Sequence, residues 1–378
     1  MTVYLDHAAT APVRREVLAA MWPFLAGEPG NPGSHHSPGD RAARALHTAL
    51  ADIATVLGCR PGEVVLTSGG TEAANLAIKG IALARPRGRH LITTAVEHPA
   101  VLESCRALAR AGFELTVLPV DRFGLVDPQQ VEAALRDDTT LVTVQLANNE
   151  VGSVQPVAEI AALAHARDVP VHTDAVQAAG VLPIGLAALG VDAVSIAGHK
   201  VGTPVGIGAL AVHAGVPIEP LIHGGGQQRG RRSGTENVAA AVGLATALVL
   251  ADRDRADAPA LAARRDAFVT RVLAGIDGTA LTGHPERRLP GSASFVVAGI
   301  SGESLLTELD ARGIAVSSGS ACAAGDDEPS PVLTAMGFHA ATAQSAIRIT
   351  MGFHTGEDEL RAAFDALREA AAGVRVLA

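Results

Sequence analysis

Lysine is rare in this chain, and one of its two lysines has the surroundings expected of an amine nucleophile. Only Lys79 and Lys200 are lysines among 30 basic residues; the rest are arginines. A guanidinium replaces an ammonium on a solvated surface, but it keeps its proton near neutral pH and cannot act as a nucleophile. Lys200 follows an apolar run and has small neighbours, so burial could lower the pKa of its amine. A solvated lysine after a strand is the alternative, and the scarcity of lysine favours a chemical role.

Two more segments carry groups that suit a phosphorylated ring. Asp174 ends the alternating run that begins at Val171, which puts a carboxylate at the end of a predicted strand. The ring nitrogen of pyridoxal phosphate needs such an acidic partner, although an ordinary helix N-cap is the alternative. The Ser68–Asn75 segment opens a helical pattern, so its backbone N–H groups and the Thr71 hydroxyl suit a phosphate. It lacks the Gly-Lys-Ser/Thr of a Walker loop, and the glycine motif at Gly206–Ala211 leads into a strand, so neither predicts a nucleotide site.

A thiol, a guanidinium and an imidazole complete the candidate groups. Cys322 lies among Ser, Gly and Ala residues, which predicts an accessible thiol, whereas Cys59 and Cys105 have apolar flanks and are predicted to be packed. Arg348 interrupts an apolar strand pattern, where it could grip a carboxylate or face water. His98 stands at a strand-to-helix turn, as an acid–base or ring-stacking group or simply as a solvated histidine.

Alternating short strands and helices predict the scaffold that positions these groups. Between about Pro61 and Val212 the pattern is that of a mostly parallel sheet covered on both faces, with its chemistry at the carboxyl ends of the strands. The predicted strands are Glu63–Leu66, His90–Thr94, Glu114–Leu118, Leu141–Leu146, Pro170–Thr173, Asp192–Ile196 and Gly208–Val212. The predicted helices between them include Glu72–Leu83, Ala100–Ala111, Gln129–Arg136 and Val157–Ala166.

A second, smaller unit is predicted after a long helical stretch that runs from Thr235 to about Gly275. It would contain strands near Ser292–Val297 and Ala346–Thr350 and helices near Glu303–Arg312 and Glu357–Ala372. The first dozen residues are expected to pack there. The predicted division is therefore a large cofactor-binding domain at 14–255 and a small domain formed by 1–13 with 256–378.

Composition narrows the function classes. The chain has 378 residues and a formal net charge of −9, and it has no basic run, which argues against a nucleic-acid or membrane-surface partner. Three scattered cysteines fit a reducing compartment, and no leader pattern is visible, so a cytoplasmic protein is expected. The apolar run Val238–Ala251 is too short to span a membrane and predicts a buried helix. Paired histidines lack a third ligand at suitable spacing, and no resident metal is predicted.

Taken in order, eleven segments resemble the cysteine desulfurase family, a branch of the class-V aminotransferases that use pyridoxal phosphate. The segments are Tyr4–Thr10, Gly30–Pro32, Thr67–Glu72, Glu97–His98, Asn148–Glu150, His172–Asp174, Gly198–Lys200, His223–Gly226, Arg232–Thr235, Ser317–Cys322 and Ser345–Arg348. The resemblance implies the α/β fold of fold-type-I enzymes, with a mostly parallel seven-stranded sheet in the large domain and a smaller α+β domain at the carboxyl end.

The same resemblance implies the site. The catalytic residues would be Cys322, Lys200 and His98, and the substrate carboxylate would be held by Asn31 and Arg348. The residues that would hold the cofactor are Gly70, Thr71, His98, Asn149, Asp174, Gln177, Ala197, His199, Lys200 and Thr235. Lys200 would carry the cofactor, Asp174 would pair with its ring nitrogen, and His98 would stack on the ring and move protons. Since Thr235 would reach the phosphate of a neighbouring subunit, a homodimer is implied.

The resemblance also implies the reaction. L-cysteine would lose its sulfur to Cys322 as a persulfide, leaving L-alanine, and a sulfur-acceptor protein would take the sulfur on. The long segment after Cys322 resembles the group that serves iron–sulfur cluster assembly and tRNA thiolation; whether Cys322 also ligates a cluster transiently is left open. Ala197 replaces the serine usual in the family. The loss of one hydrogen bond to a phosphate would cost about 1.5–3 kcal/mol of cofactor affinity.

Two other classes of function remain open at this point. An aminotransferase, or a lyase acting on selenocysteine or a cysteine sulfinate, would use Lys200 and Asp174 but not Cys322. A non-catalytic sulfur-carrier scaffold or regulatory partner that kept the fold is the other class, and the intact Lys200, Asp174 and Cys322 argue against it. Amino transfer to a 2-oxo acid would distinguish the first class, and absence of cofactor absorbance the second.

Overall fold

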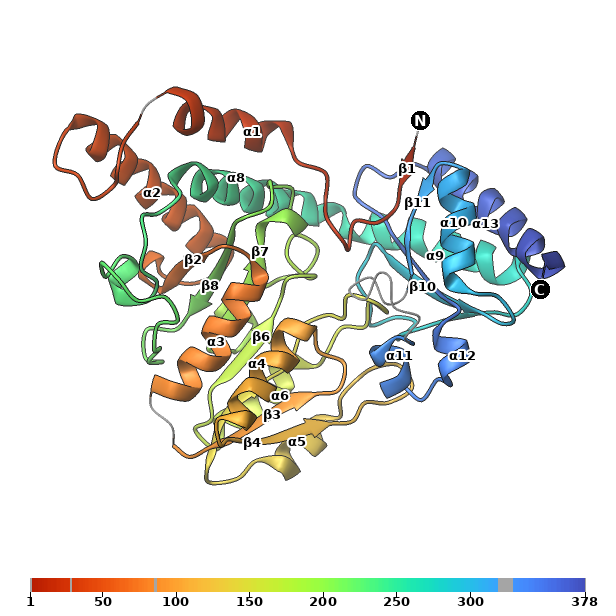
Figure 1. Cartoon of the computed structure of the whole chain (residues 1–378), viewed down its shortest axis with the longest axis horizontal. Coiled ribbons are helices and arrows are strands. Elements are labelled where there is room, and N and C mark those ends of the chain that lie inside the picture. Colours follow the sequence, from red (N-terminus) through yellow and green to blue (C-terminus); the bar gives the residue numbers. More distant parts are fainter. Residues whose placement is uncertain (1, 28, 85–86, 319–328, 378) are drawn as a thin grey trace.

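A seven-stranded sheet forms the centre of the larger part of the molecule (Figure 1). The computed structural model describes residues 2–27, 29–84, 87–318 and 329–377. The sheet has the order β2-β8-β7-β6-β5-β3-β4, and all neighbours are parallel except β8, which is antiparallel to β2 and β7. Its strands are β2 Val64–Thr67, β3 His90–Thr94, β4 Glu114–Leu118, β5 Thr139–Thr143, β6 Val171–Asp174, β7 Ala193–Ala197 and β8 Gly208–Val212. The prediction of a mostly parallel seven-stranded sheet is confirmed.

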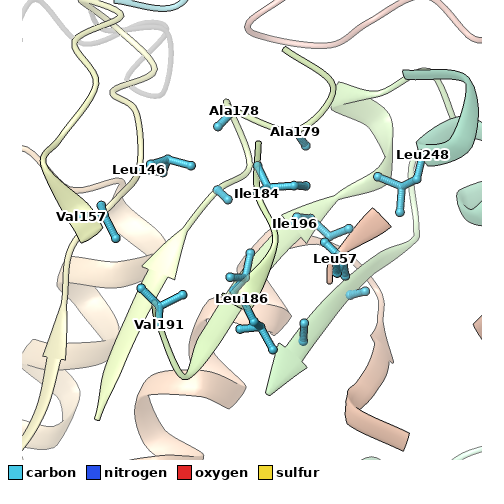
Figure 2. Packing of buried hydrophobic residues seen from close by; sticks show 14 of the residues in the cluster. Leu57, Leu146, Val157, Ala178, Ala179, Ile184, Leu186, Val191, Ile196 and Leu248 are labelled. Atoms are coloured by element: carbon cyan, nitrogen blue, oxygen red, sulfur yellow. The ribbon is translucent and has the colours of Figure 1, made fainter. Parts of the chain in front are cut away.

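Helices cover both faces of this sheet, which explains why its strands are apolar on both sides. Val65, Leu91 and Leu210 pack on one face in a cluster with side chains of α3 and α4. The alternate residues Leu66, Ile92 and Ile196 enter a larger cluster on the other face, to which α2, α6 and α8 contribute. Figure 2 shows part of that cluster, including Leu57, Ile196 and Leu248. The helices and helical turns of this part are α1 Arg15–Trp22, η1 Pro23–Gly27, α2 Ser37–Val56, η2 Pro61–Glu63, α3 Gly70–Ala84, α4 Pro99–Arg110, α5 Pro128–Ala134, α6 Val157–His165, α7 Leu186–Leu189, η3 Gly198–Lys200, η4 Gln228–Gly230 and α8 Val238–Asp254.

A smaller unit with its own core follows α8. Its four-stranded sheet has the order β12-β13-β10-β9 and is antiparallel throughout. Phe268, Phe295 and Ile347 lie in its apolar core, which the long helix α13 helps to close. The elements are η5 Arg255–Asp257, α9 Ala258–Gly275, β9 Thr279–Leu281, β10 Ser292–Val297, α10 Gly302–Ala311, β11 Ile314–Ala315, β12 Ser317–Ser318, α11 Pro331–Ala335, α12 Ala340–Ala343, β13 Ala346–Thr350 and α13 Glu357–Leu377. The domain boundaries predicted from the sequence stay a prediction.

The N-terminal segment joins the two sheets, and we call residues 3–14 the N-terminal strap. Its strand β1, Val3–Tyr4, pairs in parallel with β11, and Asp6 bridges Thr350 at the end of β13. The strap then crosses to the large unit, where the N–H groups of Ala11 and Arg14 donate to the carbonyls of His199 and Gly202 at 2.9 and 3.0 Å. In Figure 1 this red segment runs from α1 to the side of the blue small unit. The assignment of the first dozen residues to the small domain stays a prediction; Val3, Tyr4 and Asp6 make the contacts with β11 and β13 that it requires.

The structure differs from the prediction at β5. The strand ends at Thr143 rather than Leu146. The N–H groups of Val144 and Leu146 still donate to carbonyls of β6 at 3.1 and 2.8 Å, whereas the N–H of Gln145 donates to the carboxylate of Glu97 at 3.0 Å. The predicted buried helix at Val238–Ala251 is confirmed as part of α8. In the part of the chain that the structure describes, no helix has the length and apolarity to cross a membrane.

Candidate active site

Three chemically capable side chains meet at the carboxyl edge of the large sheet. Asp174 is the last residue of β6, and Lys200 ends η3, the turn that follows the neighbouring strand β7. His98 caps the N-terminus of α4, after β3, and its Nδ1 accepts the N–H of Ala100 at 3.1 Å. Parallel strands end at the same edge, so residues far apart in the sequence converge there. The three side chains lie close enough that each affects the titration of Asp174 or His98.

Burial dominates the electrostatics of this edge. It raises the pKa of Asp174. The N–H of Val176, which donates to Oδ1 at 2.9 Å, and the charges of His98 and Lys200 lower this pKa, but by less. Burial also lowers the pKa of His98, as does the charge of Lys200, while Asp174 opposes the change. A neutral His98 that accepts through Nδ1 carries its proton on Nε2. The site therefore holds a buried carboxylate that a further cation would stabilise in its charged form.

Lys200 is oriented by the N-terminal strap. Its Nζ donates to the carbonyl oxygen of Ala8, and to that of Ala9 at 2.7 Å. The side-chain amide of Gln177 donates to the same Ala8 carbonyl at 3.0 Å. Asn149, Gln177 and Lys200 all line a cleft of about 640 Å³ between the two units. The backbone carbonyls of the strap thus hold the ε-ammonium beside this cleft, whose lining, among the described residues, does not include Asp174, His98 or the start of α3.

The start of α3 forms a cradle that suits a phosphate. Gly70 is its first residue, and a Cβ built there would lie 2.8 Å from Cγ2 of Val176 and 3.3 Å from Cβ of Ala197, so only glycine fits. The first N–H groups of a helix have no partner within it, and the helix dipole favours an anion there. Thr71, the second residue of α3, is exposed at this end of the helix. His199 is another residue predicted to hold the cofactor. Burial, followed by the charge of Lys200, lowers the pKa of His199 to about 4.

These groups fit pyridoxal phosphate. A glycine cradle at a helix N-terminus would take the phosphate, the buried Asp174 carboxylate would take the ring nitrogen, and Lys200 would attach the cofactor. The fit rests on two observations: the N-terminus of α3 at Gly70, whose first N–H groups have no partner within the helix, and a buried carboxylate whose pKa burial raises.

Arg348 is buried in the middle of the small sheet and reaches the same region. It is 1% exposed, Nη1 donates to the carbonyl of Asn149 at 2.8 Å, and Nη2 donates to Oδ1 of Asp6 at 2.8 Å. Its Nε has no hydrogen-bond partner among the described residues. The alternative of an edge arginine facing water is wrong, because β13 is an interior strand between β12 and β10.

Cys322 lies outside the described residues, but the chain on either side of it is anchored near Arg348. Before it, Ser317 in β12 is the register partner of Arg348. After it, the hydroxyl of Ser330 donates to the carboxylate of Glu150 at 2.5 Å, and Glu150 follows Asn149, whose carbonyl binds Arg348. Cys59 is half-buried and Cys105 is buried, and burial raises the pKa of both thiols to about 12. Their packing agrees with the sequence prediction.

The structure does not bring Asn31 or Thr235 to this edge. Asn31 is exposed in the segment before α2, where its Oδ1 accepts the N–H of Gly33 at 2.9 Å. Thr235 is exposed in the turn before α8. An ion pair between Arg232 and Glu72, with Nε and Oε1 3.0 Å apart, ties that turn to the start of α3. Their roles stay predictions.

Two acidic residues at the site were quoted in sequence motifs without a role. Glu97 is fully buried behind His98, accepts the Thr94 hydroxyl at 2.7 Å and the N–H of Gln145, and burial raises its pKa to about 8. Asp6 binds Arg348 from the strap. In the sequence, the only signs of a role were the position of Glu97 next to His98 and the position of Asp6 within the first ten residues. Among the described residues, no three His, Cys, Asp or Glu side chains gather as a metal site would require.

A mostly parallel sheet covered on both faces, with a lysine, a carboxylate and a phosphate cradle at its carboxyl edge, defines the fold-type-I class of α/β proteins that use pyridoxal phosphate. The family model for class-V aminotransferases matches residues 3–362. The chain is 45% identical over 368 residues to "Cysteine desulfurase IscS" of Dictyoglomus turgidum, which covers 97% of this chain and 93% of that one. The chain belongs to the class-V aminotransferase family and, within it, to the cysteine desulfurases.

Solved structures of similar proteins support the same family assignment. A "NIFS-like protein" matches with a TM-score of 0.91 and 37% identity, covering 98% of this chain and 99% of the other. The structure described as "SspA in complex with cysteine" matches with a TM-score of 0.82 and 35% identity over 93% of this chain and 99% of the other.

Proposed function

We propose that this protein is a pyridoxal-phosphate-dependent cysteine desulfurase that moves the sulfur of L-cysteine onto Cys322 and releases L-alanine. The observation that carries the proposal is the convergence of Lys200, Asp174 and His98 at one sheet edge, beside the glycine cradle of α3. The names of the relatives, and the cysteine bound to the similar SspA structure, support the substrate.

The cofactor, when bound, withdraws electrons from the substrate Cα. The residues of this chain would hold and orient the reactants. Asp174 would keep a proton on the ring nitrogen, since a cation beside it offsets the burial that raises the pKa of its carboxyl group. Lys200 would attach the cofactor and, once released, return to the strap carbonyls of Ala8 and Ala9. His98, with its proton on Nε2, would exchange protons with substrate atoms.

Sulfur transfer to Cys322 balances without an added oxidant. The Cys322 thiolate attacks the substrate sulfur, an S–S bond forms, and the bond between Cβ and sulfur breaks with its electron pair going to carbon, which then takes a proton. L-cysteine and a thiol thus give L-alanine and a persulfide. A thiolate is required, because a thiol is a poor nucleophile. The anchoring of Ser317 and Ser330 beside Arg348 and Glu150 supports access of this segment to the substrate.

The proposal includes partners. A sulfur-acceptor protein of cluster assembly or tRNA thiolation would take the persulfide sulfur, and a homodimer would let Thr235 of one subunit reach the phosphate of the other. A cytoplasmic location, expected from the scattered cysteines, is also part of the proposal.

The test is Cys322→Ser. The variant should keep the visible absorbance of a lysine-bound cofactor but release no L-alanine from L-cysteine in sustained turnover, while wild-type protein gains one sulfur atom on Cys322 by mass spectrometry. Cys59→Ser is the matched control and should turn over normally. Normal alanine release by Cys322→Ser would remove this cysteine from the mechanism and favour a lyase that does not use it.

A further inference from the structure

Arg348 is a buried cation that two groups hold on opposite sides. Nη2 bonds Asp6 in the N-terminal strap and Nη1 bonds the carbonyl of Asn149 in the large unit, both at 2.8 Å. The Arg348 side chain is 2% exposed and that of Asp6 is 19% exposed. An arginine alone on a long side chain has many rotamers, and a buried charge without a partner is strongly disfavoured. The two contacts together fix both ends of the guanidinium fork.

Those contacts leave donors for a ligand. A guanidinium has five N–H groups; Asp6 and the Asn149 carbonyl take one each. Nε is buried without a partner among the described residues. Besides the buried Nε–H, one N–H of Nη1 and one of Nη2 have no acceptor among the described residues, and a carboxylate that binds end-on with both oxygens uses these two. Asp6 and a second carboxylate can occupy the same guanidinium together.

Asp6 is itself held in place by the backbone. It forms a bridge to Thr350, two residues after Arg348 on β13. The N–H of Ala8 donates to the Thr350 hydroxyl at 2.9 Å, and the N–H of Thr350 donates to the carbonyl of Leu5 at 2.7 Å. Because residues on both sides of Asp6 are fixed to the end of β13, its carboxylate meets the guanidinium without further ordering of the chain.

We propose that Asp6 is a positioning residue for Arg348, which orients the guanidinium so that its free N–H groups meet the α-carboxylate of an amino-acid substrate. This inference rests on the proposed function and adds to it a residue outside the cofactor cradle. The strap has a second contact of the same kind, since its Ala8 and Ala9 carbonyls hold Lys200. One segment therefore aligns the residue for the substrate carboxylate with the residue for the cofactor.

The opposite role for Asp6 makes an opposite prediction. If the Asp6 carboxylate occupied the place of the substrate carboxylate, its removal would free Arg348 and tighten substrate binding. If it orients Arg348, loss of the acceptor weakens binding, and an uncharged acceptor of the same shape restores it. Asp6→Ala removes the acceptor, whereas Asp6→Asn keeps an oxygen at Oδ1.

The experiment measures binding to the holoenzyme by calorimetry, with two probes that differ only in the carboxylate: L-alanine and ethylamine. Asp6→Ala should weaken L-alanine binding and raise KM for L-cysteine on the order of tenfold, with kcat and ethylamine binding little changed. Asp6→Asn should recover most of the loss. Tyr4→Phe is the control in the same strap, because it removes the bonds from the Tyr4 hydroxyl to the carbonyls of Asp6 and Thr10 without touching Arg348. It should leave L-alanine binding unchanged.

Unchanged or tighter L-alanine binding by Asp6→Ala overturns the proposal, as does equal loss for L-alanine and ethylamine. Combination with Arg348→Ala gives a second check, because Asp6→Ala should add no further loss of L-alanine binding once the arginine is gone. If Asp6→Ala fails to fold, tighter binding of L-alanine by Asp6→Asn overturns the proposal, and binding within about twofold of wild type supports it. A wild-type enzyme that released no alanine from L-cysteine would contradict the proposed function alone, since the two binding probes do not depend on turnover.

Discussion

At the scale of single residues, the phosphate cradle shows how little room the site leaves for variation. Gly70 lies between Val176 and Ala197, and any side chain at position 70 would meet one of them. Ala197 is buried at the end of β7, in the place of the serine that the resemblance to the family implies. The proposed cradle would therefore rely on backbone N–H groups and on Thr71 and His199 for its polar contacts.

Ala197→Ser should tighten cofactor binding. An added hydroxyl would give one hydrogen bond to a doubly charged phosphate, which corresponds to about tenfold or more in the dissociation constant. The constant can be measured by dialysis of the holoenzyme followed by titration of the apoprotein with pyridoxal phosphate, with cofactor absorbance as the signal. Ala193→Ser, at the other end of the same strand, should not change it. Equal affinity for Ala197→Ser and wild type would mean that the phosphate does not lie against β7.

At the scale of elements, Glu97 joins two strand ends to the helix that carries His98. It accepts hydrogen bonds from Thr94 at the end of β3 and from Gln145 just after β5, and α4 begins two residues later. Its burial raises its pKa to about 8. A buried carboxyl group with a raised pKa makes the free energy of unfolding depend on pH.

Glu97→Gln should become more stable than wild type as the pH rises. An unfolded glutamate loses its proton near pH 4, whereas folded Glu97 keeps it until about pH 8. Between these values the folded state binds one more proton, so the wild-type free energy of unfolding falls with rising pH, by a total on the order of 3–5 kcal/mol. Urea unfolding at pH 5, 6.5 and 8 measures the difference. Glu103→Gln, on the exposed face of α4, is the control, and a pH-independent difference for Glu97→Gln would contradict the prediction.

Elements with strong local signals could be predicted from the sequence. β3, β4, β8, β10 and β13 have the bounds that their β-branched and apolar runs predict. The helices α1 and α2 are absent from the prediction, although Pro38 in the first turn of α2 is a usual start signal. Lys200, Asp174 and His98 were predictable because the carboxyl ends of parallel strands share one edge. The pairing of Asp6 with Arg348 was not, because it joins residues 342 positions apart and depends on how two sheets pack.

At the scale of the whole molecule, the proposed homodimer assigns different parts of one site to two subunits. Thr235 is exposed in a turn that Arg232 ties to Glu72 at the start of α3. A residue in this position is available to a second subunit, whereas Lys200 faces the cleft of its own chain.

Mixing Lys200→Ala with Thr235→Ala should therefore restore activity. In a mixed dimer one site has both mutations and the other has neither, so subunit exchange at equal amounts should regain about a quarter of wild-type activity. Alanine release before and after exchange measures the gain. Each variant mixed with itself is the control. If activity stays at the mean of the two separate variants, Thr235 does not act across subunits.

The N-terminal strap has a consequence for how the protein is made. Its partners Arg348 and Thr350 lie near the other end of the chain, so they leave the ribosome long after Asp6 does. The large sheet can form during synthesis from residues 64–212, but β1 has no strand to pair with until β11 has emerged. The N-terminal strap is therefore fixed only after the residues up to Thr350 have been made, and a newly made chain has a complete site only from that point on.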